Sequence, residues 1–244
     1  MSHLTNPVNL LARFVKAAGG HLPNASSLTP TGVNGPILRA VSYVWTRINL
    51  RRNADHKHRR LEIGPGGDRI PGFETLNFMF GSNVDYVCDA TQRLPFADDT
   101  FTLIYASHVL EHVPWYRTVD VLREWVRVLC PGGSLEIWVP NGLKICRAFV
   151  DAEYEGHDPL ENDPWTRFNS GRDPCVWASG RIFTYGDGTG RINDPNWHRA
   201  LFSPRYLRKA MEEAGLTSVR EMDHTEVRGY DHGWINLGLR GSKQ

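Results

Sequence analysis

The chain has 244 residues, of which 41% are hydrophobic and 23% charged. This size suits one large α/β domain with an extension and excludes two full-sized domains joined by a linker. Lys and Arg number 28 against 27 Asp and Glu, so the net charge gives no global attraction for nucleic acid. We expect a cytoplasmic protein, because no apolar stretch is long enough to span a bilayer and no secretory leader is evident.

The four cysteines are Cys88, Cys130, Cys146 and Cys175. None of them forms a CxxC pair, and none stands in a His/Cys cluster of the structural-zinc type. We therefore expect free thiols, as is usual in a reducing compartment.

Residues 1–59 are predicted to form an N-terminal helical extension or cap. Apolar spacing predicts short helices over residues 10–18 and 37–50, with a loop rich in Pro, Gly and Asn between them. The basic segment 51–60 is interpreted as a solvated linker. The alternative is a peripheral contact of residues 37–60 with an anionic membrane surface or a polyanionic substrate.

From residue 60 onward strands and helices alternate, which predicts a parallel sheet with helices on both faces. We assign residues 60–244 to this domain. An irregular segment at about 155–200 interrupts the alternation and is expected to wall the substrate site. The expected strands are 61–63, 75–78, 84–88, 101–107, 134–139, 219–222 and 234–239, and the expected helices are 119–129 and 203–216.

A glycine-rich turn follows the first expected strand, in the segment LEIGPGG at 61–67. Glycine lets the backbone approach a ligand closely and adopt positive φ angles. The N–H groups that follow such a turn can bind a carboxylate or a phosphate. Dinucleotide-binding proteins carry similar turns, as do plain loops, so the turn alone leaves a nicotinamide dehydrogenase open as an alternative.

Three motifs follow the turn: Leu94-Pro95-Phe96, Val109-Leu110-Glu111-His112 and Pro131-Gly132-Gly133. In this order they resemble the class I S-adenosylmethionine-dependent methyltransferases, strongly over residues 60–140 and more weakly over 196–216. The resemblance implies a Rossmann-like fold with a seven-stranded, mostly parallel sheet and an antiparallel last strand. It implies S-adenosylmethionine as the cofactor, and it does not fit a dehydrogenase.

The resemblance also implies a cofactor site. Glu62 and the glycines of the turn would line the methionine end of the cofactor. Asp89 would accept a hydrogen bond from the adenine amine, and Ser107 would face the amino-acid or sulfonium region. The expected cofactor-binding residues are Glu62, Gly64, Gly66, Gly67, Asn77, Asp89, Ala90 and Ser107.

Two positions depart from the family pattern. The turn reads Gly-Pro-Gly-Gly where the family has a sequence closer to GxGxG. Asn77 stands where the family has an acid that binds both ribose hydroxyls, and the nearest acid is Glu74. An amide lacks the charge-assisted bidentate geometry of a carboxylate. Asn77 therefore supports an alternative function, a catalytically silent methyltransferase-like scaffold or regulatory subunit.

Histidines are the candidates for acceptor chemistry, because imidazole can take a hydroxyl proton near neutral pH. We expect His198 to be the base, with His112 and then His108 as the next candidates. On a helix, His108, Glu111 and His112 would share one face, where they could bind a metal, contact substrate or form a structural cluster. Metal-binding relatives carry Glu at the position of His108, so we expect no metal.

Aromatic residues gather after the fourth expected strand and in the irregular segment. They suit a carbohydrate or another ring-shaped acceptor, or they pack the insertion onto the core. The [DNS]PP[FYW] motif of base-amine methyltransferases is absent, so we expect no DNA substrate. We predict O-methylation of a small-molecule or sugar-containing acceptor, by a chain that forms either a monomer or a homo-oligomer. The aromatic residues are Trp115, Tyr116, Trp165, Trp177, Tyr185 and Trp197.

Overall fold

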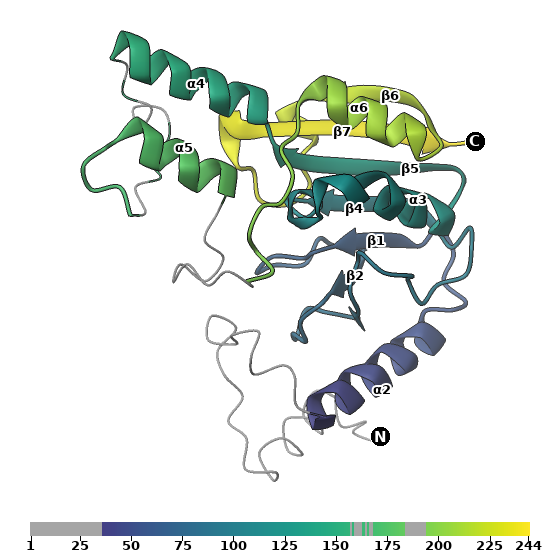
Figure 1. Cartoon of the computed structure of the whole chain (residues 1–244). Helices are drawn as coiled ribbons and strands as arrows, with labels where there is room; N and C mark the ends of the chain where they lie inside the picture. Colours follow the sequence, from purple (N-terminus) through teal and green to yellow (C-terminus); the bar gives the residue numbers. More distant parts are fainter. Residues whose placement is uncertain (1–35, 157, 159–162, 164, 166–167, 184–193) are drawn as a thin grey trace.

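A computed structural model describes residues 36–244, except 157, 159–162, 164, 166–167 and 184–193 (Figure 1). The helix expected over residues 10–18 lies outside the described residues, as does Tyr185.

One sheet of seven strands, in the order β3-β2-β1-β4-β5-β7-β6, forms the centre of the molecule (Figure 1). Strands β1 to β6 run in one direction, and β7 is antiparallel to both of its neighbours. This confirms the predicted Rossmann-like, mostly parallel sheet with an antiparallel last strand. The strands are β1 (Arg60–Ile63), β2 (Glu74–Asn77), β3 (Tyr86–Val87), β4 (Phe101–Ser107), β5 (Leu129–Pro140), β6 (Leu216–Met222) and β7 (Asn236–Lys243).

The main core lies between the sheet and two helices, α3 (Thr118–Val128) and α6 (Pro204–Glu213), which stand in front of it in Figure 1. Strand alternation sends every second side chain of the central strands toward these helices. Both helices bury an apolar stripe, which includes Trp125 of α3 and Leu207 of α6. Helix α6 begins as predicted, with Ser203 as the N-cap and Pro in the first turn.

The opposite face of the central strands has a thinner cover than predicted. Its apolar cluster combines Tyr105 and Trp138 of the sheet with Ile70 and Phe73 of the loop between β1 and β2. Within the described residues, no helix connects these two strands. The loop reads GPGGDRIPGF, and its prolines and glycines prevent a helix from propagating. The connection between β1 and β2 is therefore a loop, and the alternation of strands and helices does not extend to it.

Helix α2 (Pro36–Arg52) caps the edge of the sheet beside β3. Trp45 Nε1 donates a hydrogen bond to the Val84 carbonyl at 2.8 Å, and Asn49 Nδ2 donates to the Asp85 carbonyl at 3.0 Å. The helix expected over 37–50 is therefore present, and its polar side chains bind it to the sheet edge. Its outer side exposes Tyr43.

The basic segment after α2 contains a buried ion pair. Arg59 Nε and Nη2 each donate to a different Glu74 carboxylate oxygen at 2.8 Å, a bidentate arrangement. Arg59 Nη2 also donates to the Tyr86 hydroxyl at 3.2 Å. The interpretation of residues 51–60 as a solvated linker is thus wrong for Arg59, which joins the amino-terminal ends of the first strands.

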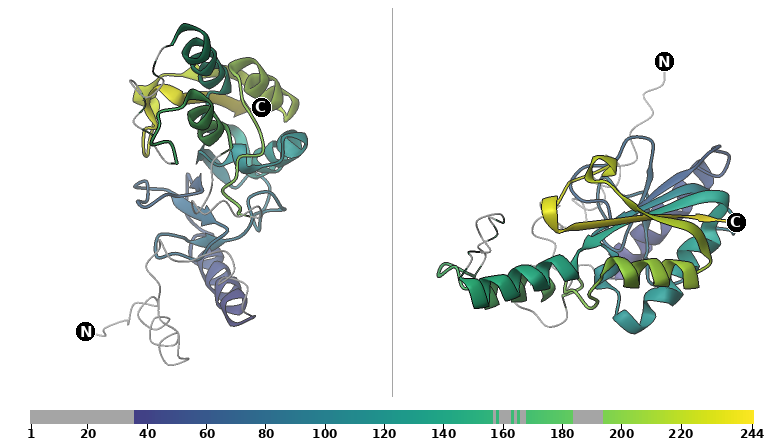
Figure 2. Two further views of the ribbon diagram at one scale, coloured as in Figure 1. Left: turned by 60° about the vertical axis from the view of Figure 1, so that its left-hand side comes forward. Right: turned by 90° about the horizontal axis from the view of Figure 1, so that it is seen from above.

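After β5 the chain forms α4 (Gly142–Glu155) and α5 (Pro174–Phe183), which pack against each other. Seen from above, α4 extends well beyond the sheet (Figure 2, right). Trp177 of α5 is fully buried in a small core with Ile145 of α4. The segment predicted to be irregular therefore contains a helix. No described helix is long and apolar enough to cross a membrane.

Candidate active site

The carboxyl ends of the parallel strands gather the predicted cofactor residues at one edge of the sheet. Gly64 directly follows β1, Asn77 ends β2 and Ser107 ends β4. Asp89 comes two residues after β3. Open parallel sheets bind their ligands at this edge, where neighbouring strand ends and loops leave a crevice.

The glycine-rich turn packs directly against the VLEH segment. Gly64 has a φ of +71°, and a Cβ atom there would lie 2.3 Å from Val109 Cγ2. Only glycine fits both conditions. Gly66 and Gly67 are exposed, and no atom lies within 4 Å of the position that a Cβ would take at either. Asn83 Nδ2 donates to the Gly66 carbonyl at 2.8 Å and so fixes the turn. This residue was not identified from the sequence.

Glu62 lies beneath the turn. Its neighbours Leu61 and Ile63 face the main core, so alternation turns Glu62 to the opposite face of the sheet. There Glu62 Oε2 accepts a hydrogen bond from the Ile70 backbone N–H at 3.2 Å. Burial raises the pKa of this carboxyl. Glu62 thus holds the loop that follows the turn.

The side chains of Asn77 and Asp89 each accept a hydrogen bond from a backbone N–H two residues further along the chain. Asn77 Oδ1 accepts from the Met79 N–H at 3.4 Å, and Asp89 Oδ1 accepts from the Thr91 N–H at 2.8 Å. Asp89 is exposed to solvent. Glu74, the other acid near β2, stands at the amino-terminal end of that strand and binds Arg59. Glu74 is therefore unavailable as a substitute for the missing ribose-binding acid.

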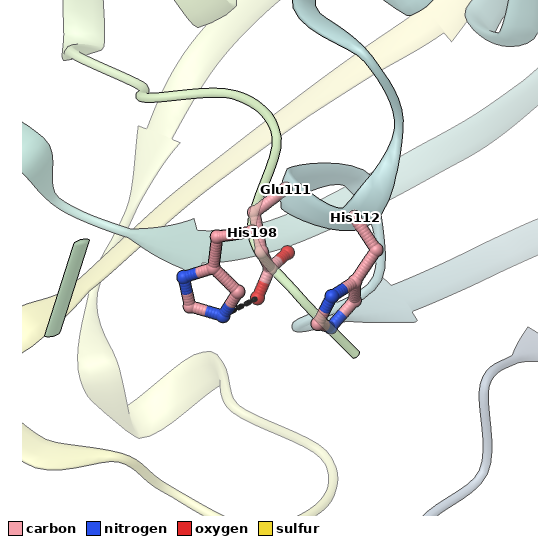
Figure 3. Close-up of side chains that lie close together, drawn as sticks. All are labelled: Glu111, His112 and His198. Atoms are coloured by element: carbon pink, nitrogen blue, oxygen red, sulfur yellow. Dashed lines mark ion pairs between the residues drawn. The ribbon is translucent and has the colours of Figure 1, made fainter. Parts of the chain in front are cut away.

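A cluster of imidazoles and one carboxylate begins where β4 ends. His108 has a φ of +53°, and Leu110–His112 forms a single 3-10 turn instead of the expected α-helical turn. Glu111, His112 and His198 come together, with one candidate ligand atom of each within 4.8 Å of the others (Figure 3). The set predicted from the sequence is therefore changed, since His198 takes the place of His108.

Backbone hydrogen bonds bring His198 to this position. The N–H groups of Arg199 and Ala200 donate to the Glu111 carbonyl at 2.7 and 3.1 Å, and the Trp115 N–H donates to the Arg199 carbonyl at 3.2 Å. The segment 198–200 thus lies along the 3-10 turn. His198 Nε2 faces Glu111 Oε1 at 3.9 Å.

The Glu111 carboxylate is buried, with 1% of its side chain exposed. Neither of its oxygens has a properly aligned hydrogen-bond partner among the described residues. His108 Nδ1 lies 3.3 Å from Oε1. Burial disfavours ionisation, but the contact with His108 outweighs it and lowers the pKa of Glu111 to about 2. Glu111 is therefore a carboxylate at neutral pH.

His108 contacts Glu111 from outside the cluster. Its Nε2 lies 2.8 Å from Asn236 Oδ1, and Asn236 Nδ2 donates to Asp231 Oδ1 at 2.7 Å. Both ring nitrogens of His108 therefore face acceptor oxygens, which favours the imidazolium. Although burial opposes the charge, Glu111 and Asn236 raise the pKa of His108. The His108 ring also stacks on His232, with centroids 3.6 Å apart.

The other two imidazoles are oriented by backbone groups. His112 Nδ1 lies 3.4 Å from the Trp197 carbonyl, which only accepts, so Nδ1 donates in this contact. The His198 ring hydrogen bonds to the Ile182 backbone, and burial lowers its pKa to about 4. His198 is therefore neutral at neutral pH.

A cavity of about 620 Å³ opens beside His198. Trp115 and Tyr116 line it and are 66% and 69% exposed. The predicted aromatic wall is thus reduced, because Trp177 is buried in the core and Trp165 packs against α5. The lining residues are Trp115, Tyr116, Val119, Ile182, Phe183, His198, Arg199, Ala200, Leu201, Tyr206, Lys209, Ala210 and Glu213.

Residues 72–137 match the family of methyltransferase domains. The matched segment runs from the end of the glycine-rich loop into β5, so it contains the ends of β2 and β4, Asp89 and the VLEH turn. The sheet order, with its antiparallel β7, extends the agreement to the rest of the domain. The match and the sheet order support the prediction of a class I S-adenosylmethionine-dependent methyltransferase. The matched family implies S-adenosylmethionine as the cofactor.

Solved structures resemble the chain at low identity. A methyltransferase of Thermotoga maritima is 17% identical, with 97% of this chain and 99% of that chain covered and a TM-score of 0.43. The YcgJ protein of Bacillus subtilis is 14% identical, with 83% and 99% covered and a TM-score of 0.44. No curated protein sequence matches the chain. The likeness to methyltransferases therefore rests on the match of residues 72–137 and on the sheet order.

Proposed function

We propose that this methyltransferase methylates a hydroxyl oxygen of a small-molecule or sugar-containing acceptor. The observation that supports the proposal is the contact of Gly64, in the glycine-rich turn, with Val109, which stands two residues before Glu111. A sulfonium donor is already activated, so alignment and desolvation supply much of the catalysis. A hydroxyl acceptor must in addition lose a proton, and the neutral imidazole of His198 suits that task.

The residues that would hold the cofactor lie along the carboxyl edge of the sheet. The exposed glycines of the turn leave open space for the methionine end, while Glu62 fixes the loop beneath them. We propose that Asn77 binds the ribose, that Asp89 and Ala90 bind the adenine, and that Ser107 faces the sulfonium region. The bound cofactor supplies the activated methyl group.

We propose that His198 and His112 act on the acceptor. His198 belongs both to the cluster and to the lining of the cavity, so an acceptor in the cavity would reach it. His108 does not line the cavity and contacts Glu111 instead. Its role is to position the Glu111 carboxylate, in place of the catalytic role expected from the sequence.

The cavity supports a ring-shaped acceptor. Trp115 and Tyr116 present flat apolar faces at its wall, and Lys209 and Glu213 add charged groups. Such a combination suits a sugar or an aromatic ring that carries hydroxyl groups. The four cysteines are free thiols, which fits the cytoplasmic location that we propose.

The test is a screen for homocysteine-product release with paired acceptors that carry a hydroxyl, an amine or an acidic carbon at the same position. We expect turnover with the hydroxyl series and an O-methyl product by mass spectrometry. An N-methyl or C-methyl product would overturn the oxygen assignment. Calorimetry that detects no S-adenosylmethionine binding would favour the silent scaffold that Asn77 suggests.

A further inference from the structure

We propose that Glu111, His112 and His198 bind a divalent transition-metal ion, which would take the acceptor oxygen in the proposed reaction. The three side chains offer two nitrogens and one oxygen within 4.8 Å of one another (Figure 3). Around an ion with metal–ligand distances of about 2.0–2.2 Å, ligand atoms lie about 3–4 Å apart. Small side-chain rotations therefore suffice to close the site.

The buried carboxylate is the first reason for the proposal. Burying an ionised carboxylate is costly unless its oxygens are bonded or a cation pairs with them. Both Glu111 oxygens lack an aligned hydrogen-bond partner among the described residues. At 3.9 Å, His198 Nε2 is too far from Oε1 to hydrogen bond. A cation between these two atoms would bind both.

The outer contacts are the second reason. Imidazoles that bind a metal usually donate their other ring N–H to a carbonyl or carboxylate, which fixes the tautomer and the ring orientation. His112 Nδ1 faces the Trp197 carbonyl, and the His198 ring bonds to the Ile182 backbone. Glu111 is likewise contacted from behind by His108, which Asn236 orients. Each ligand thus has a neighbour that holds it in place.

The donor set selects the class of ion. Two imidazoles and one carboxylate suit Zn²⁺, Mn²⁺, Fe²⁺ or Co²⁺, whereas Mg²⁺ and Ca²⁺ prefer oxygen ligands. Three protein ligands leave coordination positions open. Because His198 also lines the cavity, an acceptor hydroxyl could fill one of them. The ion would lower the pKa of that hydroxyl, whose proton would pass to solvent water. This departs from the expectation of no metal, because the tertiary structure supplies His198 in place of His108.

The test is a titration of the metal-free full-length protein with Co²⁺, followed by visible absorption, without cofactor or acceptor. We expect one saturable site per chain, with weak competition from Mg²⁺ and strong competition from Zn²⁺. Glu111→Gln and His198→Ala should weaken Co²⁺ binding at least ~100-fold, and His108→Ala by about 10–100-fold. His56→Ala and His224→Ala are the controls, since both histidines are exposed and distant in sequence, and binding should not change.

His112→Ala is the second ligand variant, for use if Glu111→Gln fails to fold by circular dichroism. Absence of a saturable Co²⁺ site in the wild-type protein would overturn the proposal, and so would equal affinity in the folded ligand variants. The proposed function fails separately. If Co²⁺ binds but the product is N-methylated, the metal site stands and the oxygen assignment falls. If O-methylation survives complete chelation, the oxygen assignment stands and the metal role falls.

Discussion

At the scale of single residues, Gly64 shows how the turn depends on its neighbour. Gly64→Ala would place a Cβ atom 2.3 Å from Val109 Cγ2 at a φ of +71°. We expect a loss of about 1–3 kcal/mol in the free energy of unfolding, measured by denaturant titration, from backbone strain and the clash. Gly66→Ala is the matched control, because its Cβ meets open space, and its stability should be nearly unchanged. Equal stability of both variants would contradict this reading.

Asp89 separates a cofactor role from a turn role. If its carboxylate accepts the adenine amine, Asp89→Ala should weaken S-adenosylmethionine binding by roughly 1–3 kcal/mol in calorimetry. The same side chain accepts from the Thr91 N–H, so its removal also affects the local turn. Stability and affinity must therefore be measured together. Lower stability with unchanged affinity would show that Asp89 serves only the turn.

His198 is the residue on which the chemistry is expected to depend. His198→Ala should lower turnover by ~10²–10⁴-fold, whether the imidazole takes the acceptor proton directly or holds an ion that activates the hydroxyl. The affinity for S-adenosylmethionine should change little, since the predicted cofactor residues stand at the strand ends. A raised acceptor KM with preserved kcat would instead make His198 a binding residue. Steady-state kinetics decides between these outcomes.

At the scale of elements, the start of α6 bears on the cavity, because Tyr206 and Ala210 of this helix line it. Ser203 Oγ accepts from the Tyr206 N–H at 3.3 Å as the N-cap. Ser203→Ala should lower the free energy of unfolding by about 1 kcal/mol in denaturant titration. Ser203→Asp keeps an N-cap acceptor and should retain most of the stability. If Asp is as destabilising as Ala, the capping bond is not the cause.

The element that forms the site is a single 3-10 turn, not an α-helix. Residues 110–112 are followed by Pro114, which has no N–H to continue a helix. The Glu111 carbonyl, which a longer helix would use internally, accepts instead from the N–H groups of residues 199 and 200. Because the turn is short, the segment 198–200 can hydrogen bond to it, and this pairing brings His198 close to Glu111.

At the scale of the whole molecule, ligand binding should stabilise the fold by mass action. At about 100 times its dissociation constant, S-adenosylmethionine should add ~2.7 kcal/mol, or about 5–10 °C in the melting temperature. Differential scanning fluorimetry measures this directly, with a nicotinamide dinucleotide as the control ligand. A shift with the dinucleotide alone would support the dehydrogenase alternative. No shift with either would favour the silent scaffold.

The local sequence was enough to predict the strands and the caps of the domain. The strand over Phe101–Ser107 and the cap at Ser203 appear as expected, because alternation and capping act between residues close together in the chain. The motif order predicted the family and the sheet topology. Proline and glycine in the loop after β1 carried a signal against a helix there, one that the general alternation of strands and helices outweighed.

The tertiary structure alone decided the composition of the candidate site. His198 lies far along the chain from Glu111, and it arrives through backbone pairing that no local pattern records. The same holds for Arg59, which is buried because it pairs with Glu74 of the neighbouring strand β2. Local sequence specifies backbone conformation and which faces are apolar, whereas buried charges depend on partners from distant segments. The sequence predicted which types of residue would form the site. The tertiary structure was needed to show which of the candidate histidines lie together.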